Sequence, residues 1–389
     1  MSWPMIPLGE LVNIKGGGTP DKSNSEYWNG EIPWASVKDF KKNTLDSTLD
    51  SITLLGAKNS ATSVIPAGNI IIPTRMALGK VAINTIDLAI NQDLKALSIK
   101  DNNVVDRDYL FRWLESQSSL IESEGKGATV KGITLPFLKG LNVPIPPLNE
   151  QKRIAAIFEK VDSIRQKCNR GVKLADDLLH AIFLDMFGDP VENPKGWVID
   201  SLFKYGAFRN GMNFSKGESG ATLKCLGVGD FKSLATITCM DNIGEIKLNT
   251  LPSDDYLLKD GDIVFVRSNG NKALVGRCLT IYPGKGKVTF SGFCIRYRIE
   301  NPSLLPEYLN FLFRTPSMKQ QMLSGGQGAN IQNISQGTLS ALRIPVPPLE
   351  KQLAFSKVVS FHSALMEKLD INTAKTEDMF DSISQQYFN

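Results

Sequence analysis

Residues 16–23, GGGTPDKS, have the residue types and spacing that come nearest to a phosphate-binding loop. A P-loop needs a glycine directly before its lysine, so that backbone N–H groups can wrap the phosphates. Asp21 occupies that place, and its carboxylate would repel phosphate. A P-loop NTPase also needs an aspartate at the end of a hydrophobic strand to hold Mg²⁺. The two apolar strand candidates, NIIIPT and DIVFV, do not end in an aspartate. We interpret the stretch as a glycine-rich turn after a strand.

The sequence motifs of other catalytic sites are also incomplete. A methyltransferase needs a glycine-rich cofactor turn and an Asn/Asp-Pro-Pro-aromatic strand end; GVGDF at 227–231 has the glycines, but the tetrad is missing. A nuclease needs clustered acids with a lysine, and SDDY at 253–256 stands alone. The two histidines, His180 and His362, are too few for a typical zinc site or triad. The sequence predicts neither a catalytic residue nor a metal site.

Glycine-bounded turns that carry Lys, Arg, Asn, Gln and Ser are better suited to DNA. Arg and Lys read guanine, Asn and Gln read adenine, and basic side chains bind phosphate. RSNGNK at 267–272 combines these types in six residues, although a solvated hairpin is the alternative. The predicted DNA-contacting residues are Lys15, Thr19, Lys22, Lys38, Arg75, Lys80, Lys126, Lys131, Arg209, Asn213, Lys216, Lys232, Arg267, Asn269, Asn271, Lys272, Arg277, Gln327 and Asn330.

The distribution of charge permits binding of a polyanion by the second half of the chain. The net charge is +4, and residues 190–348 hold 18 basic against 12 acidic side chains, whereas the first half is balanced.

A length of 389 residues predicts two or three domains. There is no apolar run of the roughly 18–20 residues that span a bilayer, no signal-peptide pattern and no CxxC pair among five cysteines. We expect a cytoplasmic protein with no membrane segment.

The sequence segments that must position these turns occur twice in the chain. VPIPPLNEQ at 143–151 returns as IPVPPLEKQ at 344–352, and GKGATVKGIT at 125–134 returns as GQGANIQNIS at 326–335. GNIIIPTR at 68–75 faces GDIVFVRS at 261–268. The same blocks in the same order indicate a diverged tandem repeat.

Each half has the same predicted order of elements. Short β-type runs, such as NIIIPT and KALSIK or DIVFVR and FCIRYRI, are broken by Gly, Asn and Pro. One short amphipathic helix follows, near 108–114 and 307–313. The Pro-x-Pro-Pro-Leu run stops the strand pattern, because proline lacks an N–H, and leads into a long helix.

The long helices, 149–187 and 350–388, carry apolar residues at spacings of three and four. Such spacing over several heptads predicts a coiled-coil seam. We expect the two helices, each about 58 Å long, to pack antiparallel, with Gly171 as a gap; folding of each helix onto its own half is the alternative. The predicted seam residues are Ile154, Ile157, Val161, Ile164, Leu178, Ile182, Phe355, Val358, Leu365, Leu369 and Ile383.

The predicted fold is α+β, with two repeated β-rich domains separated by two long antiparallel helices. The predicted boundaries are 1–148 and 189–348 for the β-rich domains and 149–188 and 349–389 for the helices.

The chain resembles the specificity subunit of type I restriction–modification systems. The resemblance lies in PIPPLNEQKRIAAIFEKVDSI at 144–164, its degenerate copy PVPPLEKQLAFSKVVSFHSAL at 345–365, and the PLGEL…GGGTP…YW…IPW opening. It implies two target-recognition domains that each read half of a bipartite site in double-stranded DNA, with the helices as a spacer. In the second copy Lys351 replaces Glu150 and Phe355 replaces Ile154, which leaves open whether both helices dock partners equally well.

The resemblance also implies partners and cofactors. Two modification subunits would bring S-adenosylmethionine, and restriction (translocase) subunits would bring ATP and Mg²⁺, while this chain would hold no cofactor and catalyse nothing. Two other function classes stay open from the residues alone: a stand-alone DNA methyltransferase or nuclease with unrecognised motifs, and a coiled-coil scaffold that binds only protein.

Overall fold

The structure is a computed structural model that describes residues 3–127, 131–215, 217–231, 235–324 and 333–388. Backbone contacts divide the chain into two units. Unit 1 comprises Met1–Asn169 and Ile371–Asn389, and unit 2 comprises Arg170–Asp370. Each unit therefore holds a β-rich domain with parts of both long helices. The four-part division suggested by the sequence repeat stays a prediction.

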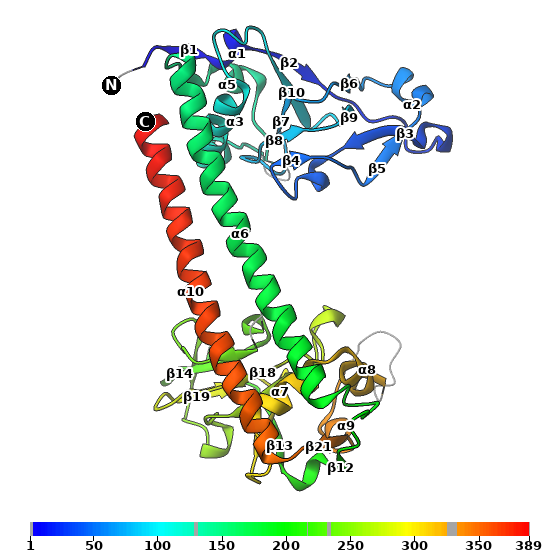
Figure 1. Cartoon of the computed structure of the whole chain (residues 1–389), viewed down its shortest axis with the longest axis vertical. Helices are drawn as coiled ribbons and strands as arrows, with labels where there is room; N and C mark the ends of the chain where they lie inside the picture. Colours follow the sequence, from blue (N-terminus) through cyan, green and yellow to red (C-terminus); the bar gives the residue numbers. More distant parts are fainter. Residues whose placement is uncertain (1–2, 128–130, 216, 232–234, 325–332, 389) are drawn as a thin grey trace. The chain divides into compact units, whose positions relative to one another are not determined.

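The main sheet of unit 1 has the strand order β2–β10–β7–β8–β4 (Figure 1). Its strands are β2 Val12–Gly16, β4 Thr44–Leu45, β7 Ile70–Pro73, β8 Ala82–Asn84 and β10 Leu94–Ile99. All four residues of β7 are buried, because both faces of this strand are covered: Ile70 and Ile72 face one apolar core and Ile71 faces another. The strands predicted from NIIIPT and KALSIK are confirmed.

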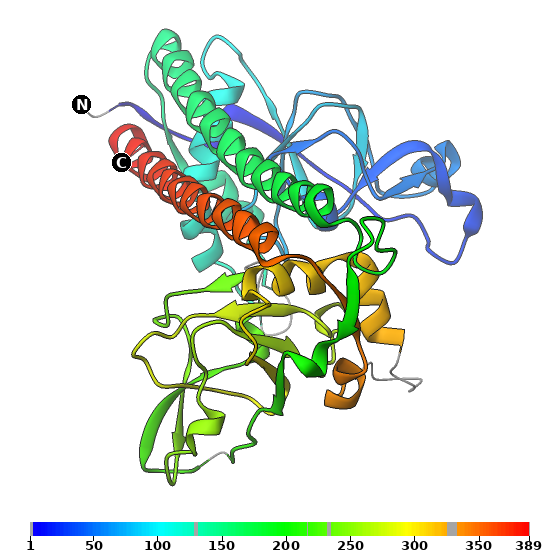
Figure 2. The same ribbon diagram turned by 60° about the horizontal axis from the view of Figure 1, so that its bottom comes forward.

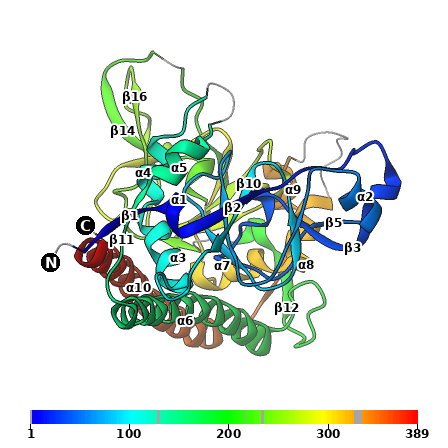
Figure 3. The ribbon, with the colours of Figure 1, turned by 90° about the horizontal axis from the view of Figure 1, so that it is seen from above.

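Two smaller sheets complete the strands of unit 1. Four strands, β3 Trp28–Ala35, β5 Asp50–Ile52, β6 Val64–Ile65 and β9 Leu88–Ile90, pair in the order β5–β3–β9–β6. β1, Met5–Pro7, lies antiparallel to β11, Asn142–Pro144 (Figure 3). The short helices are α1 Leu8–Leu11, η1 Ser25–Tyr27, η2 Val37–Asp39, α2 Leu54–Lys58, α3 Arg107–Ser116, α4 Ser118–Ser123 and α5 Leu135–Gly140.

Unit 2 repeats this plan. Its main sheet has the order β13–β20–β17–β18–β15, beside a β16–β14–β19 sheet and a β12–β21 pair. The strands are β12 Val198–Ser201, β13 Gly206–Asn210, β14 Ala221–Leu226, β15 Thr236–Ile237, β16 Glu245–Leu248, β17 Asp262–Val266, β18 Cys278–Ile281, β19 Val288–Phe290, β20 Cys294–Ile299 and β21 Arg343–Val346. The matching strand orders confirm the tandem repeat.

The helices of unit 2 also follow the plan of unit 1. They are η3 Leu202–Lys204, η4 Val228–Asp230, η5 Asp254–Tyr256, η6 Lys272–Leu274, α7 Pro306–Arg314, α8 Pro316–Ser324 and α9 Gln336–Ser340. In Figure 2 the strands from β12 to β20 run from green to yellow, with α7 and α8 in gold. The short helices predicted near 108–114 and 307–313 are confirmed as α3 and α7.

The long helices are α6, Leu148–Phe187, and α10, Leu349–Phe388. Each begins one residue before the apolar pattern predicted for it, at 149 and 350. Within unit 1 the start of α6 lies along the end of α10, with the Phe158 and Phe380 rings 5.0 Å apart. Within unit 2 the end of α6 lies along the start of α10, with the Phe183 and Phe355 rings 5.4 Å apart. The helix segments therefore run antiparallel in both units, as predicted.

The predicted seam is only partly correct. Ile154, Val161, Phe355 and Ile383 are buried, and Ile157, Ile182, Val358 and Leu369 are half-buried. Ile164, Leu178 and Leu365 are 47%, 60% and 38% exposed, so their assignment to the seam was wrong.

The correction has a physical reason, because the helix ends pack into the domain cores as well as against each other. In unit 1 Phe158 shares a core with α3. In unit 2 Leu179, Phe183 and Phe187 share a core with α7. The buried face of α6 is therefore the one that carries Phe158 and Phe183, next to the face that was predicted. Each helix packs both against the other helix and against a domain, so the two packing alternatives occur at the same time.

The proline-rich run is fastened to each domain by a buried glutamine. Gln151 donates from Nε2 to the carbonyl oxygens of Val104 and Pro146, and its Oε1 accepts from the N–H of Asp106. Gln352 makes the equivalent bonds to Ser303, Pro347 and Leu305. Both glutamines are 0% exposed. The Pro-Pro-Leu-x-x-Gln pattern is thus the joint between a domain and its helix.

Candidate nucleic-acid interface

Three loops of unit 2 meet at one end of its main sheet. They comprise residues 211–213 after β13, 267–271 after β17, and 291–293 between β19 and β20; we call them the unit-2 loop cluster. The N–H of Arg267 donates to the Phe293 carbonyl at 2.8 Å, and the N–H of Gly292 donates to the Met212 carbonyl at 2.8 Å. Backbone hydrogen bonds therefore hold the three loops as one surface.

Four predicted DNA-contacting residues, Arg267, Asn269, Asn271 and Lys272, lie in or beside this cluster. The alternative of a tight hairpin is not what forms, because residues 267–277 make a long connection between β17 and β18 that contains η6. Arg267 is half-buried, while Asn271 and Lys272 are exposed.

The two asparagines shape the loop. Asn269 Oδ1 accepts from the N–H of Asn271 at 2.8 Å, and Asn271 Oδ1 accepts from the N–H of Ala273 at 3.0 Å. Each oxygen already accepts one backbone N–H, and neither amide nitrogen donates a hydrogen bond in the described part of the chain. The structure thus favours donation by these side chains, whereas the sequence suggested only that asparagine reads adenine.

Asn213 joins the cluster from the loop after β13. Its amide oxygen lies only 2.0 Å from the position that a Cβ on residue 292 would occupy, so a side chain there would clash with Asn213. Glycine at 292 therefore permits the two loops to touch. Arg277, at the end of the β17–β18 connection, is exposed and approaches the Phe231 carbonyl at 3.5 Å.

The corresponding loops of unit 1 form the unit-1 loop cluster, residues 17–19, 74–76 and 91–93. The N–H of Thr74 donates to the Asp93 carbonyl at 2.8 Å, as Arg267 does to Phe293. Thr19 hydrogen-bonds to Gln92 through their side chains. Arg75 lies 3.6 Å from the Asp93 carboxylate. The two clusters therefore share a frame and differ in side chains.

Lys131 and Lys126 border the unit-1 loop cluster. The N–H of Met76 donates to the Lys131 carbonyl at 3.1 Å, and both lysine side chains are exposed. Met76 has a φ of +70° and is 60% exposed. A non-glycine residue in that conformation is strained, and such strain often occurs at functional sites. This group adds two exposed lysines beside the unit-1 loop cluster.

The other predicted contacts lie elsewhere. Lys15 is in β2, Lys22 is in the following loop, and Lys38 is in η2; all three are exposed. Lys80 donates to the Phe40 carbonyl at 3.0 Å. Lys216, Lys232, Gln327 and Asn330 lie outside the described residues.

Arg209 is held in a separate group of charged residues on the unit-2 sheet. Its guanidinium lies 3.0 Å from Asp255 Oδ2 and 4.3 Å from the centre of the Tyr256 ring. Arg296, its direct partner on β20, is buried, and burial together with the nearby Arg298 lowers the pKa of Arg296. Arg209 therefore has an acidic and an aromatic partner within the protein, and its contact with DNA stays a prediction.

Sequence reasoning missed Gln92, Asp93 and Phe293. Phe293 is 60% exposed and borders a hollow of about 430 Å³ together with Val228, Ser268, Asn269 and Gly270. The sequence pattern placed Phe293 in a strand, whereas β20 begins at Cys294. No motif or spacing in the sequence singled out Gln92 or Asp93.

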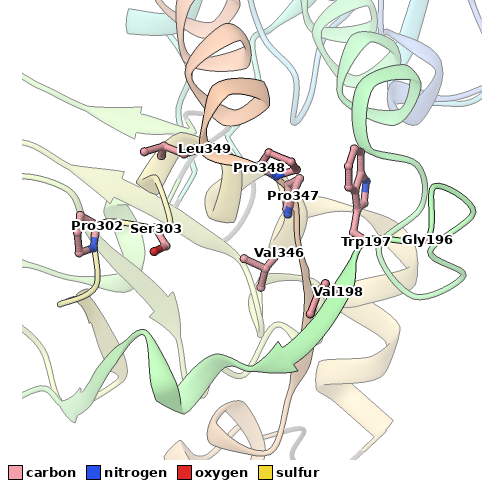
Figure 4. Close-up of a pocket in the computed structure, with 9 residues that line it drawn as sticks. All are labelled: Gly196, Trp197, Val198, Pro302, Ser303, Val346, Pro347, Pro348 and Leu349. Carbon is pink, nitrogen blue, oxygen red and sulfur yellow. The ribbon is translucent and has the colours of Figure 1, made fainter.

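A second hollow in unit 2, of about 520 Å³, lies where α10 begins. Figure 4 shows Trp197 beside Pro347 and Pro348, with Ser303 on the far side. The indole N–H of Trp197 donates to the Phe187 carbonyl at 2.9 Å, which ties the end of α6 to β12. The lining contains no titratable side chain, so we assign this hollow to the helix joint.

Apolar side chains stay exposed on the long helices in unit 2. Leu174 and Leu178 of α6 are 55% and 60% exposed, and Phe361 and Leu365 of α10 are 74% and 38% exposed. Each lies one position before a buried or half-buried residue of its helix. In an antiparallel pair, such positions flank the same side of the contact. They form a surface with the character of a protein interface.

Metal-ligating side chains and thiols bear on whether the described ranges could hold a catalytic site. Within them, no three His, Cys, Asp or Glu side chains gather as metal ligands, and no helix is long and apolar enough to cross a membrane. Burial raises the pKa of Cys225 and of Cys278 to about 12, so neither thiol is an activated nucleophile.

Known proteins resemble this chain along most of its length. A family model described as the type I restriction modification DNA specificity domain matches residues 2–174 and 222–378. The EcoR124I/EcoR124II specificity subunit of Escherichia coli is 37% identical over 172 residues, which cover 42% of each chain. The MjaIX specificity subunit of Methanocaldococcus jannaschii is 24% identical over 290 residues, 68% of this chain and 66% of that protein. The matches thus span less than two thirds of both relatives.

Solved structures share the fold. The S subunit from M. genitalium superposes with a TM-score of 0.55 at 15% identity, covering 100% of this chain and 96% of that one. A structure from a study of complex assembly and conformational transition in a type I R-M system superposes with a TM-score of 0.61 at 17% identity, covering 99% and 97%. Because the family model matches most of the chain, the protein belongs to the type I restriction–modification DNA specificity domain family.

Proposed function

We propose that this chain is the DNA-binding specificity subunit of a type I restriction–modification complex. The observation that carries the proposal is the pair of loop clusters, which recur at equivalent places in two repeats of one fold. Each cluster ends a sheet in polar and basic side chains of the types that read base edges and phosphates. Two clusters with different side chains would read two different half-sites, and the DNA site would be bipartite.

Partner subunits supply the chemistry in this proposal. Two modification subunits bind S-adenosylmethionine and methylate adenine, and restriction subunits use ATP and Mg²⁺; this chain contributes recognition and docking and is not itself catalytic. The exposed residues Leu174, Leu178, Phe361 and Leu365 support a docking surface on the helices. Replacing Leu178 with Arg puts a charge on that surface without opening a core, and it should prevent assembly while leaving the melting temperature unchanged.

The test is to co-express the chain with its modification subunits and sequence the resulting DNA methylation. A split motif with a fixed unread gap is the expected result, and a single contiguous motif would contradict the proposal. Exchanging residues 1–148 for those of another specificity subunit should change one half of the motif and leave the other intact. Methylation by the purified chain alone would favour an enzyme instead, and a complex that binds no DNA would favour a protein scaffold.

A further inference from the structure

The hollow beside Asn269 and Phe293 has the features of a base-reading site. It measures about 430 Å³ and combines an apolar side, Val228 and Phe293, with a polar side, Ser268 and Asn269. Gly270 completes the lining, and a Cβ at that position would meet no protein atom within 4 Å. The hollow is therefore open at Gly270 and has apolar and hydrogen-bonding groups side by side.

Phe293 is presented by a firmly held turn. Its carbonyl accepts from the N–H of Arg267 at 2.8 Å, and its own N–H donates to Ser291 Oγ at 3.3 Å. The N–H of Ser291 donates to the Leu226 carbonyl at 2.9 Å. A large apolar ring is thus kept 60% exposed on a backbone with fixed geometry. That is the arrangement expected of a contact residue, because little order is lost on binding.

The orientation of the Asn269 amide follows from its partner. Its oxygen accepts from the N–H of Asn271, so the NH₂ group is the part of the amide that remains to donate. The described part of the chain offers this nitrogen no acceptor. The site therefore presents a donor beside an apolar surface.

Thymine is the base whose major-groove edge matches these groups. It carries the O4 acceptor next to the C5-methyl group, whereas cytosine presents an N4 donor and no methyl. We propose that this hollow reads a thymine, with the Asn269 NH₂ donating to O4 and with Phe293 and Val228 contacting the methyl group. The proposal rests on the DNA-specificity function given above and assigns one base of the half-site read by unit 2.

Charge supports DNA as the occupant of the hollow. Arg267, Lys272 and Arg277 belong to the same β17–β18 connection, and residues 190–348 carry six more basic than acidic side chains. A hollow on a connection that also carries basic side chains suits a base edge flanked by phosphates.

Unit 1 has different chemistry at the same place. Asp93 is the structural equivalent of Phe293, and it faces Arg75 at 3.6 Å. A charged pair offers no surface for a methyl group. The thymine contact is therefore specific to unit 2 and should not appear in the other half-site.

The experiment uses the methyltransferase assembled with its modification subunits and oligonucleotides that carry its methylated motif. At each pyrimidine of both half-sites, four bases are compared: thymine, deoxyuridine, 5-methylcytosine and cytosine. This set varies the methyl group and the O4 or N4 group independently. At one position of the unit-2 half-site, loss of the methyl group should weaken binding about fourfold, which corresponds to burial of one methylene-sized group.

Three variants assign the groups. Phe293→Ala should abolish the difference between thymine and deoxyuridine at that position. Asn269→Asp keeps the oxygen that caps Asn271 but replaces the donor with an acceptor, so preference should move from thymine toward cytosine. Gly270→Leu puts a large apolar side chain at the open edge of the hollow, and it should weaken binding of thymine about tenfold or more, in the range of a lost base contact. Phe203→Ala is the matched control, since Phe203 is 67% exposed in the same unit but outside the hollow.

The outcomes separate this inference from the proposed function. If the wild-type complex binds no specific site, the proposed function fails. If it binds a bipartite site but shows no methyl effect in the unit-2 half-site, or if Phe293→Ala leaves the effect in place, the thymine contact alone is wrong. A methyl effect confined to the unit-1 half-site would also overturn it. Unchanged melting temperatures check that each variant folds.

Discussion

Phe388, near the end of α10, stacks on Phe158, near the start of α6, with ring planes 7° apart and centres separated by 5.4 Å. Phe388 also meets Tyr109 of α3 edge to face at 5.6 Å. Phe187 meets Tyr308 in the same way in unit 2. A residue late in the sequence thus completes the core of the first domain.

Phe388→Ala should therefore destabilise unit 1 by about 3–5 kcal/mol, the usual cost of truncating a buried phenylalanine. Hydrogen exchange followed by residue range would show faster opening in 1–169 than in 170–370. Met379→Ala is the control, because Met379 lies on the same helix and is 47% exposed. Equal loss of protection in both units would show that the core is not divided as described.

Gln352→Leu should destabilise unit 2 by roughly 3 kcal/mol, because buried polar groups left without partners cost about 1–3 kcal/mol each. The substitution leaves the N–H of Leu305 and the carbonyl oxygens of Ser303 and Pro347 without their side-chain partner. Urea unfolding of the variant gives the value. Lys351→Ala, at the exposed neighbouring position, should change stability little. A loss below 0.5 kcal/mol for Gln352→Leu would mean that water replaces the glutamine.

Arg267→Ala should lower specific DNA binding by the assembled methyltransferase about tenfold or more, the range of a lost base contact. Its backbone hydrogen bonds to Phe293 and Ile334 do not need the side chain, so folding and assembly should be unaffected. The change should relax one position of the half-site read by unit 2. Binding curves on oligonucleotides altered in one half-site at a time measure this effect.

Lys272→Ala should weaken DNA binding without changing sequence preference, in contrast to Arg267→Ala. Lys272 is exposed at the start of η6, and contact with a phosphate would make its loss weaken all sequences alike. The slope of log affinity against log salt should fall by about one. If Arg267→Ala and Lys272→Ala give the same pattern, the loop does not distinguish bases from phosphates.

The free energy of unfolding of unit 2 should depend on pH through the titration of His180. Burial, followed by the charge of Arg314, lowers the pKa of His180 below its ordinary value of 6.5, although Asp176 and Asp177 oppose the shift. The unfolded chain then binds the proton more readily, so stability present above about pH 6.5 is lost as the pH falls toward the folded-state pKa. Urea unfolding from pH 7.5 to 5 should show a slope of up to about 1.4 kcal/mol per pH unit. His180→Gln, which keeps His362, should reduce that slope; an unchanged slope would place the titration elsewhere.

Much of the fold followed from the sequence because its signals are repeated. The strand cores, the short helices and the starts of α6 and α10 recur in both halves, and one copy supports the other. The seam was less predictable. Three-and-four spacing on α6 fits two adjacent stripes, and only the domain cores decide that Phe158 and Phe183 are buried while Ile164 and Leu178 are not.

The candidate site was predictable at the level of loops, not contacts. RSNGNK marked the correct connection, but the hydrogen bonds that turn the Asn269 amide outward depend on local geometry. Phe293 read as the first residue of a strand, because an aromatic before Cys-Ile-Arg-Tyr fits the β pattern. Its exposure follows from the bonds of the turn to three other segments, which lie far away in the sequence.

The division of the long helices between the units affects the order in which the protein folds during synthesis. Unit 2 is one continuous stretch, Arg170–Asp370, whereas unit 1 needs Ile371–Asn389 to finish its core. The ribosome makes most of unit 1 first, but Phe380, Ile383 and Phe388 emerge after all of unit 2. The first domain made is therefore the last to complete its core, and until then the apolar surface around Tyr109 and Phe158 lacks its partner Phe388.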